Sequence, residues 1–440
     1  MQLKQIRLRF KNIINSQNIK VSAVGNLMIK FLSAFFTLLT GILMASAMNI
    51  EGYGYYVLAF TTVTLLSIPL TMGLPNLIIR YFSIYDSNDQ KQEMKGMVIR
   101  ANQIIFFIFL IILILGYITY LVWWKSYNIE FVNALWFGFI LLLFMGLSAI
   151  RAAMLTGLKY VVLGQIPDTI LKNTLLCLGV FLYYISNNEL SPAKAMIIHA
   201  IAAGISFVIG HYFLHLKLLG KIKGIKPIYH NKKWFREAIP FSLNSGVQVI
   251  RSKSVNYVLA IFGSVEGVAI YDIALRGAGL VSFTLTAINT AIAPYISSAF
   301  EKQDLKNLQN IITKTSRIIF VSAIPVTLIF ILGGKSLIAL MFGSSFKDAY
   351  IPLIIMCVGQ LVSSIMGSVG LVLSMSGNQK FFTRNNLYIT LTNIILSIPF
   401  IIYFDVIGAA LITAILLIIQ NITLFIYLRN KLKINTTIFR

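Results

Sequence analysis

Long apolar segments dominate this chain and limit what it can fold into. Each is long enough, at about 1.5 Å per helical residue, to cross a hydrocarbon core of about 30 Å. The twelve runs fall at residues 21–47, 55–79, 99–123, 131–155, 161–186, 194–216, 238–262, 268–296, 313–333, 350–374, 383–404 and 406–428. With 58% hydrophobic and 12% charged residues, a soluble fold could not bury this much apolar surface. The sequence therefore predicts an all-α polytopic membrane protein with twelve transmembrane helices.

The positions of the basic residues predict its orientation. With the N-terminus in the cytoplasm, 28 of the 37 Lys and Arg residues, Arg151 among them, fall in the termini and cytoplasmic loops, and four fall in external loops. The other five lie inside spans. Both termini are expected to be cytoplasmic, and no cleavable signal peptide is expected because the first twenty residues lack an apolar core. Since the net charge of +23 is spread over short loops, no nucleic-acid partner is expected.

The domain plan follows from these runs. We expect a basic N-terminal segment at 1–20, a first lobe of six helices at 21–216, a basic linker at 217–237, a second lobe at 238–428, and a tail at 429–440. The lobes resemble each other, because the acidic-Gly turn at Glu51-Gly52 recurs at Glu266-Gly267, an offset of 215 residues. Six spans per lobe return the chain to the same side, so the repeat is parallel.

The first span carries one charge, Lys30, on a stripe that also holds Asn26, Ser33 and Thr37. A lone ammonium inside a span costs about 2.5–3.5 kcal/mol, so Lys30 should face a wet cavity or a partner. The alternative is that Lys30 extends its ammonium to the cytoplasmic interface.

Two other intramembrane cations follow an acid by four residues. Asp168 precedes Lys172, and Asp272 precedes Arg276, which is the favoured order for a helical ion pair. Either pair could be purely structural. No cofactor or metal site is expected, because His211 and His215 have ligand spacing but lack a third ligand.

The seventh span holds two further cations, Arg251 and Lys253. Arg251 shares a face with Asn244 and Gln248, whereas Lys253 lies about 200° away around the helix. We therefore expect Arg251 to face a central cavity, at a different depth from Lys30. The candidate substrate-binding residues are Lys30, Asn26, Arg251, Gln248, Asn244, Lys253, Arg276 and Asp272. Fixed cations at several depths suit an anionic substrate.

Three stretches carry a resemblance to a known family: Asn49–Asp86, Gly263–Phe300 and Ser376–Leu416. The chain resembles bacterial polysaccharide flippases of the O-antigen type, in the multidrug/oligosaccharidyl-lipid/polysaccharide exporter superfamily. The resemblance implies two V-shaped six-helix lobes, alternating access, and transfer of undecaprenyl-diphosphate-linked glycan to the outer leaflet of the bacterial inner membrane. It also implies membrane lipids, a polysaccharide polymerase and a chain-length regulator as candidate partners.

That resemblance also implies cationic positions on the first and eighth helices, matched here by Lys30 and Arg276. Many relatives carry an acid late in the seventh helix, whereas none lies between Glu237 and Glu266 here. The alternatives are a multidrug antiporter of the same fold, a membrane polysaccharide polymerase and an assembly scaffold. An antiporter usually needs intramembrane carboxylates and a polymerase a large external loop, so a non-enzymatic flippase is favoured.

Overall fold

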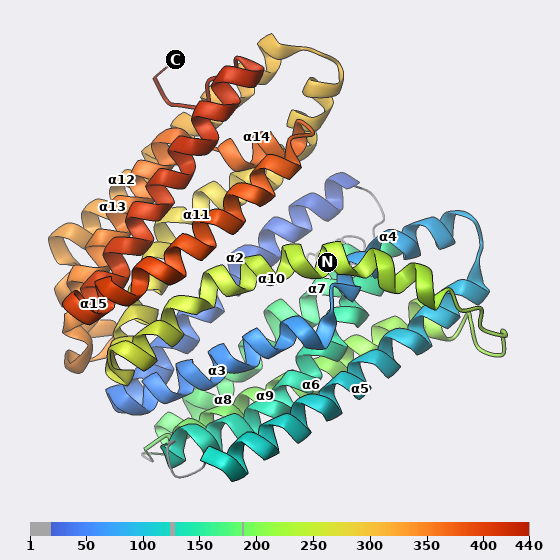
Figure 1. Cartoon of the computed structure of the whole chain (residues 1–440), viewed down its shortest axis with the longest axis horizontal. Helices are drawn as coiled ribbons and strands as arrows, with labels where there is room; N and C mark the ends of the chain where they lie inside the picture. Colours follow the sequence, from blue (N-terminus) through green and yellow to red (C-terminus); the bar gives the residue numbers. More distant parts are fainter. Residues whose placement is uncertain (1–18, 124–127, 187–188, 440) are drawn as a thin grey trace, which may run out of the picture. The chain divides into compact units, whose positions relative to one another are not determined.

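The computed structural model describes residues 19–123, 128–186 and 189–439, except for the side chains of 19–27, Trp123 and Pro294. The expected segment 1–20 therefore lies almost wholly outside the described residues. Figure 1 shows a nearly all-helical chain, without a strand in the described ranges. Ten helices are long and apolar enough to cross a membrane.

Two further crossings complete the twelve expected from the sequence. The 54-residue helix α15 (Gln379–Leu432) contains two spans, because Asp405 breaks it with φ 45° and ψ −127° at the predicted turn. The 32-residue helix α10 (Asn231–Phe262) is long enough, but its charged side chains lower its hydropathy. The chain therefore has two six-helix lobes related by a parallel repeat.

The helices group into two packing units. The first consists of residues 1–48 and 59–249, and the second of residues 49–58 and 250–440. The change of unit thus falls at Val249, inside α10, rather than in the linker 217–237. The N-terminal half of α10 packs with the first unit because Trp234 is buried and its Nε1 donates to the Tyr85 hydroxyl at 3.1 Å.

The first unit is built from the earlier helices, and α6 packs along α9 within it. They are α2 (Ile19–Ala47), the part of α3 (Ile50–Thr71) from residue 59 onward, α4 (Leu74–Ser87), α5 (Lys91–Trp123), α6 (Ile129–Gly157), α7 (Val161–Ile166), α8 (Lys172–Ile185) and α9 (Pro192–Leu214). The run predicted at 55–79 is divided between α3 and α4, because Met72 and Gly73 adopt positive φ values of 45° and 72°. At Gly73 a Cβ would lie 2.4 Å from the Ser242 nitrogen, so the absence of a side chain here allows the α10 backbone to approach this turn closely.

The second unit contains the remaining helices, with α13 packed along α15. They are α11 (Val265–Glu301), α12 (Leu305–Phe342), the short 3-10 helix η4 (Ser344–Ala349), α13 (Tyr350–Met366) and α14 (Val369–Met375). The run predicted at 350–374 is interrupted at Gly367, which has φ 67°.

The internal repeat reappears as two equivalent helix caps. The Asn49 side chain accepts from the Gly52 nitrogen at 2.7 Å, and Ser264 accepts from the Gly267 nitrogen at 2.9 Å. Both caps satisfy an otherwise unpaired first-turn N–H, and they are 215 residues apart, the offset found in the sequence.

Candidate functional site

A charged cluster in the second unit is centred on Asp272 of α11. Arg276 Nε donates to Asp272 Oδ2 at 2.6 Å, which confirms the ion pair predicted one turn apart. The Tyr53 hydroxyl donates to the same oxygen at 2.8 Å. One carboxylate oxygen is therefore shared by a guanidinium and a phenol.

Tyr53 is a residue that the sequence analysis did not single out. It lies in the first turn of α3, which Asn49 caps, and its ring meets Phe346 edge-on with centroids 5.9 Å apart. The repeated acidic-Gly turn marked this segment, but nothing in the sequence indicated that its tyrosine is fully buried against a carboxylate.

The two cations of α10, Arg251 and Lys253, interact with different groups of side chains, as expected because they lie about 200° apart around the helix. Lys253 is half-buried and interacts electrostatically with Asp272 and Arg276. Arg251 is also half-buried, and its guanidinium donates to the side-chain oxygens of Asn386, at 3.2 Å, and of Gln420. Lys253, Asp272 and Arg276 therefore form one candidate site, and Arg251 a second.

Neutral amides surround Arg251. Gln420 also donates through Nε2 to Asn386 Oδ1, so the guanidinium and both amides form a closed ring of hydrogen bonds. Gln420 additionally lines a cavity of about 390 Å³ with Asn289, Gln360 and Asn421. Since amides hold Arg251 without neutralising it, it keeps a full positive charge.

The remaining predicted residues belong to the first unit. Lys30 is half-buried on α2, and Asn244 and Gln248 are exposed on α10. The side chain of Asn26 lies outside the described residues. Part of the polar stripe of α2 is used in helix packing, because Asn173 Nδ2 of α8 donates to Ser33 at 3.3 Å and to Thr37 at 3.2 Å.

Asp168 forms its contact ion pair with Arg151 of α6, whose Nη2 lies 2.5 Å from Asp168 Oδ2. It interacts with Lys172, the partner expected from the sequence, electrostatically but without a contact ion pair. Asp168 lies in a π-helical turn, η2 (Pro167–Leu171), where the backbone is wider than an α-helix, so a spacing of four residues no longer places two side chains in register. Arg151, counted above with the cytoplasmic loops, is only 2% exposed.

The Arg151–Asp168 pair lies beside a small cavity. Asp168 and Lys172 line a space of about 200 Å³ together with Ser148, Phe144 and other side chains of α6. This charged cavity lies entirely within the first unit. It could not be predicted from residue spacing, because its lining comes from separate segments of the chain.

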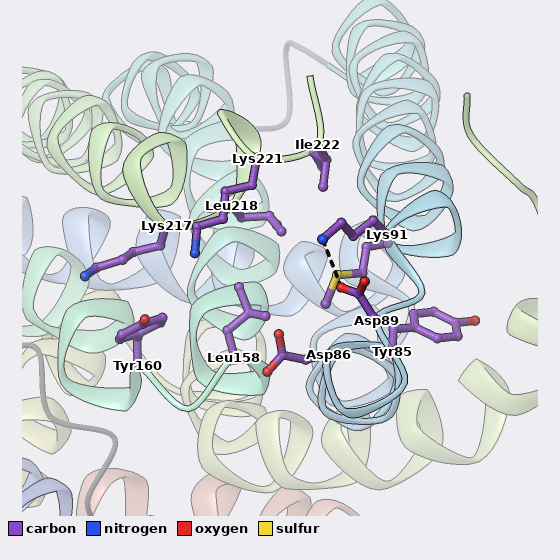
Figure 2. A pocket seen from close by; sticks show the side chains of 11 residues that line it. Tyr85, Asp86, Asp89, Lys91, Leu158, Tyr160, Lys217, Leu218, Lys221 and Ile222 are labelled. Atoms are coloured by element: carbon purple, nitrogen blue, oxygen red, sulfur yellow. Dashed lines mark ion pairs between the residues drawn. The ribbon is translucent and has the colours of Figure 1, made fainter. Parts of the chain in front are cut away.

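Two charged surfaces of the first unit include residues of α4: one lies beside the segment 217–222 and the other beside the start of α10. Figure 2 shows the smaller, a pocket of about 130 Å³ in which Asp86 and Asp89 lie among lysines. Lys91 pairs with Asp89 at 2.9 Å, and Lys217 lies 4.6 Å from the Tyr160 ring centroid. The charges of this pocket are largely balanced.

The other surface, here called the basic basin, is strongly cationic. It has a volume of about 630 Å³ and is lined by Arg80, Lys232, Lys233, Arg236, Glu237, Pro240 and Phe241. Glu237 forms an ion pair with Arg80 at 3.2 Å. Burial and a hydrogen bond to Glu237 raise the pKa of the neighbouring Tyr81 to about 12. Four cations against one carboxylate leave a net charge of +3.

Solved structures of other proteins share this fold at low sequence identity. An inward-facing multidrug resistance MATE family transporter of the MOP superfamily has a TM-score of 0.76 and 15% identity, over 93% of this chain and 98% of that one. The lipid II flippase MurJ, in an inward closed conformation, has a TM-score of 0.70 and 17% identity, over 91% and 87%. A MOP superfamily transporter from Pyrococcus furiosus has a TM-score of 0.60 and 15% identity, over 96% and 97%.

These likenesses and the ten apolar helices define the class: a multi-pass membrane protein with the fold of the MOP superfamily flippases and transporters. The sequence pattern of one family, "Polysaccharide biosynthesis protein", matches residues 20–300, which is more than half of the chain. The chain therefore belongs to the polysaccharide biosynthesis protein family. No curated protein sequence matches it.

Proposed function

We propose that this protein is a flippase for undecaprenyl-diphosphate-linked oligosaccharide repeat units, of O-antigen or a similar surface polysaccharide. The units would move from the inner to the outer leaflet of the bacterial cytoplasmic membrane, with both protein termini in the cytoplasm. One observation carries the proposal: the half-buried and buried positions described above hold more bases than acids. The bases are Lys30, Arg151, Lys172, Arg251, Lys253 and Arg276, and the acids are Asp168 and Asp272.

The chemistry of the substrate explains why such an excess would be needed. A diphosphate that enters a medium of low dielectric constant loses hydration worth many kcal/mol, so fixed cations and polar groups must replace its water. The membrane potential, negative inside, favours outward movement of an anion by about 2.3 kcal/mol per charge per 100 mV. Outward transport therefore needs no coupling ion on energetic grounds.

The candidate residues divide into three roles. Lys30, Arg251, Lys253 and Arg276 would attract the diphosphate, and Asp272 would orient Arg276. Asn26, Asn244 and Gln248 would offer neutral hydrogen bonds to phosphate or sugar oxygens. Arg251 is well prepared for this role because its present partners are neutral amides, which a phosphate can displace without separating an ion pair.

The test is leaflet-resolved analysis of lipid-linked glycan in cells that carry Lys30→Ala or Arg251→Ala. We expect both variants to insert into the membrane, to lose surface glycan, and to accumulate lipid-linked units on the cytoplasmic leaflet. Lys30→Arg and the exposed-site variant Lys306→Ala serve as controls and should retain surface glycan. Normal surface glycan in both alanine variants would refute the role of these cations.

Deletion of the whole protein separates the flippase from an antiporter of the same fold. A flippase predicts trapped lipid-linked units and unchanged drug susceptibility. An unchanged leaflet distribution together with increased drug susceptibility would refute the proposed function.

A further inference from the structure

A long apolar groove lies next to the basic basin, also within the first unit. It has a volume of about 1100 Å³ and runs between α4, α5 and the N-terminal half of α10. Leu77, Met97 and Ala101 form part of its buried floor, and the exposed side chains of Phe107, Phe235 and Leu243 stand along its sides. An open apolar groove of this size on a membrane protein fits a hydrocarbon chain.

Hydrogen bonds and close backbone contacts hold the helices that form the groove in place. Trp234, which lines it, is held by its hydrogen bond to Tyr85, and the Ile228 nitrogen donates to the Gln92 carbonyl at 3.1 Å. Gly73 brings the backbone of α10 against the turn between α3 and α4. These contacts fix α10 relative to α4 and α5, so the groove exists before any ligand arrives.

One end of the groove is cationic. Arg100 lines it, and its guanidinium donates to Asn231 at 2.9 Å and to Gln103 at 3.1 Å. Both partners are neutral, and no carboxylate among the described side chains forms an ion pair with Arg100. Its charge is therefore positioned but not neutralised.

The basic basin continues from this same end. Lys232 lines both the groove and the basin, so the apolar space and the space with net charge +3 meet at one side chain. An occupant that satisfies both must have a long hydrocarbon chain joined to a compact headgroup with several negative charges.

The length of the groove matches one leaflet. From Lys232 to Leu243 on α10 the helical rise is about 16 Å, and from Arg100 to Ile108 on α5 it is about 12 Å. Half of a hydrocarbon core is about 15 Å thick. The part of a hydrocarbon chain that fills the groove would thus reach from a headgroup in the basin to about the middle of the membrane.

We propose that the groove and the basic basin together form the capture site for a polyprenyl diphosphate, with the prenyl chain in the groove and the diphosphate at Lys232, Lys233 and Arg236. This inference rests on the proposed function and adds the place where the substrate first binds. The basin favours a diphosphate over an ordinary phospholipid because a diphosphate presents more than one negative charge to its four cations.

The test is direct binding of undecaprenyl diphosphate to the full chain in lipid nanodiscs, measured by native mass spectrometry with phosphatidylglycerol as competitor. We expect the triple variant Lys232→Gln, Lys233→Gln, Arg236→Gln to weaken binding at least about tenfold. A control triple variant at exposed cations elsewhere, Lys302→Gln, Lys306→Gln, Lys380→Gln, should bind as the unmodified protein does.

A second pair of variants tests the groove separately from the charge. Phe107→Gln alters a groove side chain that is 66% exposed, whereas Phe106→Gln alters its neighbour, 57% exposed and outside the groove. Only Phe107→Gln should weaken binding. Equal binding by all variants, or displacement of undecaprenyl diphosphate by an equal concentration of phosphatidylglycerol, would overturn the proposal.

The two proposals fail in different ways. If the basin binds undecaprenyl diphosphate but deletion of the protein leaves the leaflet distribution unchanged, the capture site stands and the flippase function fails. If deletion traps lipid-linked units but the basin triple variant binds and transports normally, the flippase function stands and the capture site is wrong.

Discussion

The Arg151–Asp168 pair gives the sharpest prediction about the fold. Arg151 is 2% exposed, and its Nε and Nη1 atoms make no hydrogen bond to the described residues, so Asp168 is its main source of compensation. Removing one partner of a buried pair typically costs about 3–5 kcal/mol. We expect Asp168→Asn to cost about 3 kcal/mol, because the amide keeps one acceptor oxygen and the Asp168 side chain is 26% exposed.

The two buried cysteines supply the assay. Cys177 on α8 is a free thiol in the first unit, so in a Cys357→Ala background a thiol-reactive dye reports the unfolding of that unit. Replacing both charges, with Arg151→Met and Asp168→Leu, should recover part of the lost stability, because the buried guanidinium is removed together with its partner while the half-buried Lys172 loses the nearby carboxylate.

Lys172 is the matched control, since it interacts with Asp168 electrostatically but forms no contact ion pair with it. Lys172→Met should cost less than about 1 kcal/mol because it breaks no contact ion pair. If Lys172→Met and Asp168→Asn were equally destabilising, or if the double replacement recovered nothing, the account of this pair would be refuted.

Three further predictions concern other features of the fold. Gly210→Ala should destabilise the first unit by about 1–3 kcal/mol in the same assay, because its Cβ would lie 2.0 Å from Arg151 Nη1, whereas Gly220→Ala, also in the first unit, would meet no atom closer than 3.4 Å and should be neutral. Tyr53→Phe removes a buried hydrogen bond to a charged group and should lower the free energy of unfolding by about 1.5–3 kcal/mol. The melting temperature should fall accordingly, and an unchanged melting temperature would contradict this. The pKa of Tyr81 is raised from 10.0 to about 12, so folded protein keeps this proton while unfolded chain loses it. Stability should therefore fall between pH 10 and 12, and less steeply in Tyr81→Phe, which denaturant titration at several pH values can measure.

Much of the architecture could be predicted because apolar length and charge placement are read directly from sequence. Twelve crossings, the turn at Asp405 and the repeat of the Glu51-Gly52 turn all follow from local patterns. The Asp272–Arg276 pair was predictable for the same reason, since the helix around it is regular.

The failures occur where the backbone leaves the regular helix or where contacts are distant in sequence. The π-helical turn at Pro167–Leu171 changes the register, so the partner of Asp168 comes from another helix. Tyr53 reaches Asp272 across 219 residues, and Asn386 and Gln420 reach Arg251 from α15. Hydropathy and spacing hold no information about such contacts, which depend on how the helices pack.

The helices α3 and α10 have a mechanical consequence. Residues 50–58 of α3 pack in one unit and residues 59–71 in the other, and α10 changes unit at Val249. Two of the three changes of unit therefore fall inside continuous helices, and the third falls between α2 and α3 at residues 48–49. A movement of one unit against the other would have to bend these two helices, and Pro69 and Pro240, both within the first unit, are positions where a helix bends more easily.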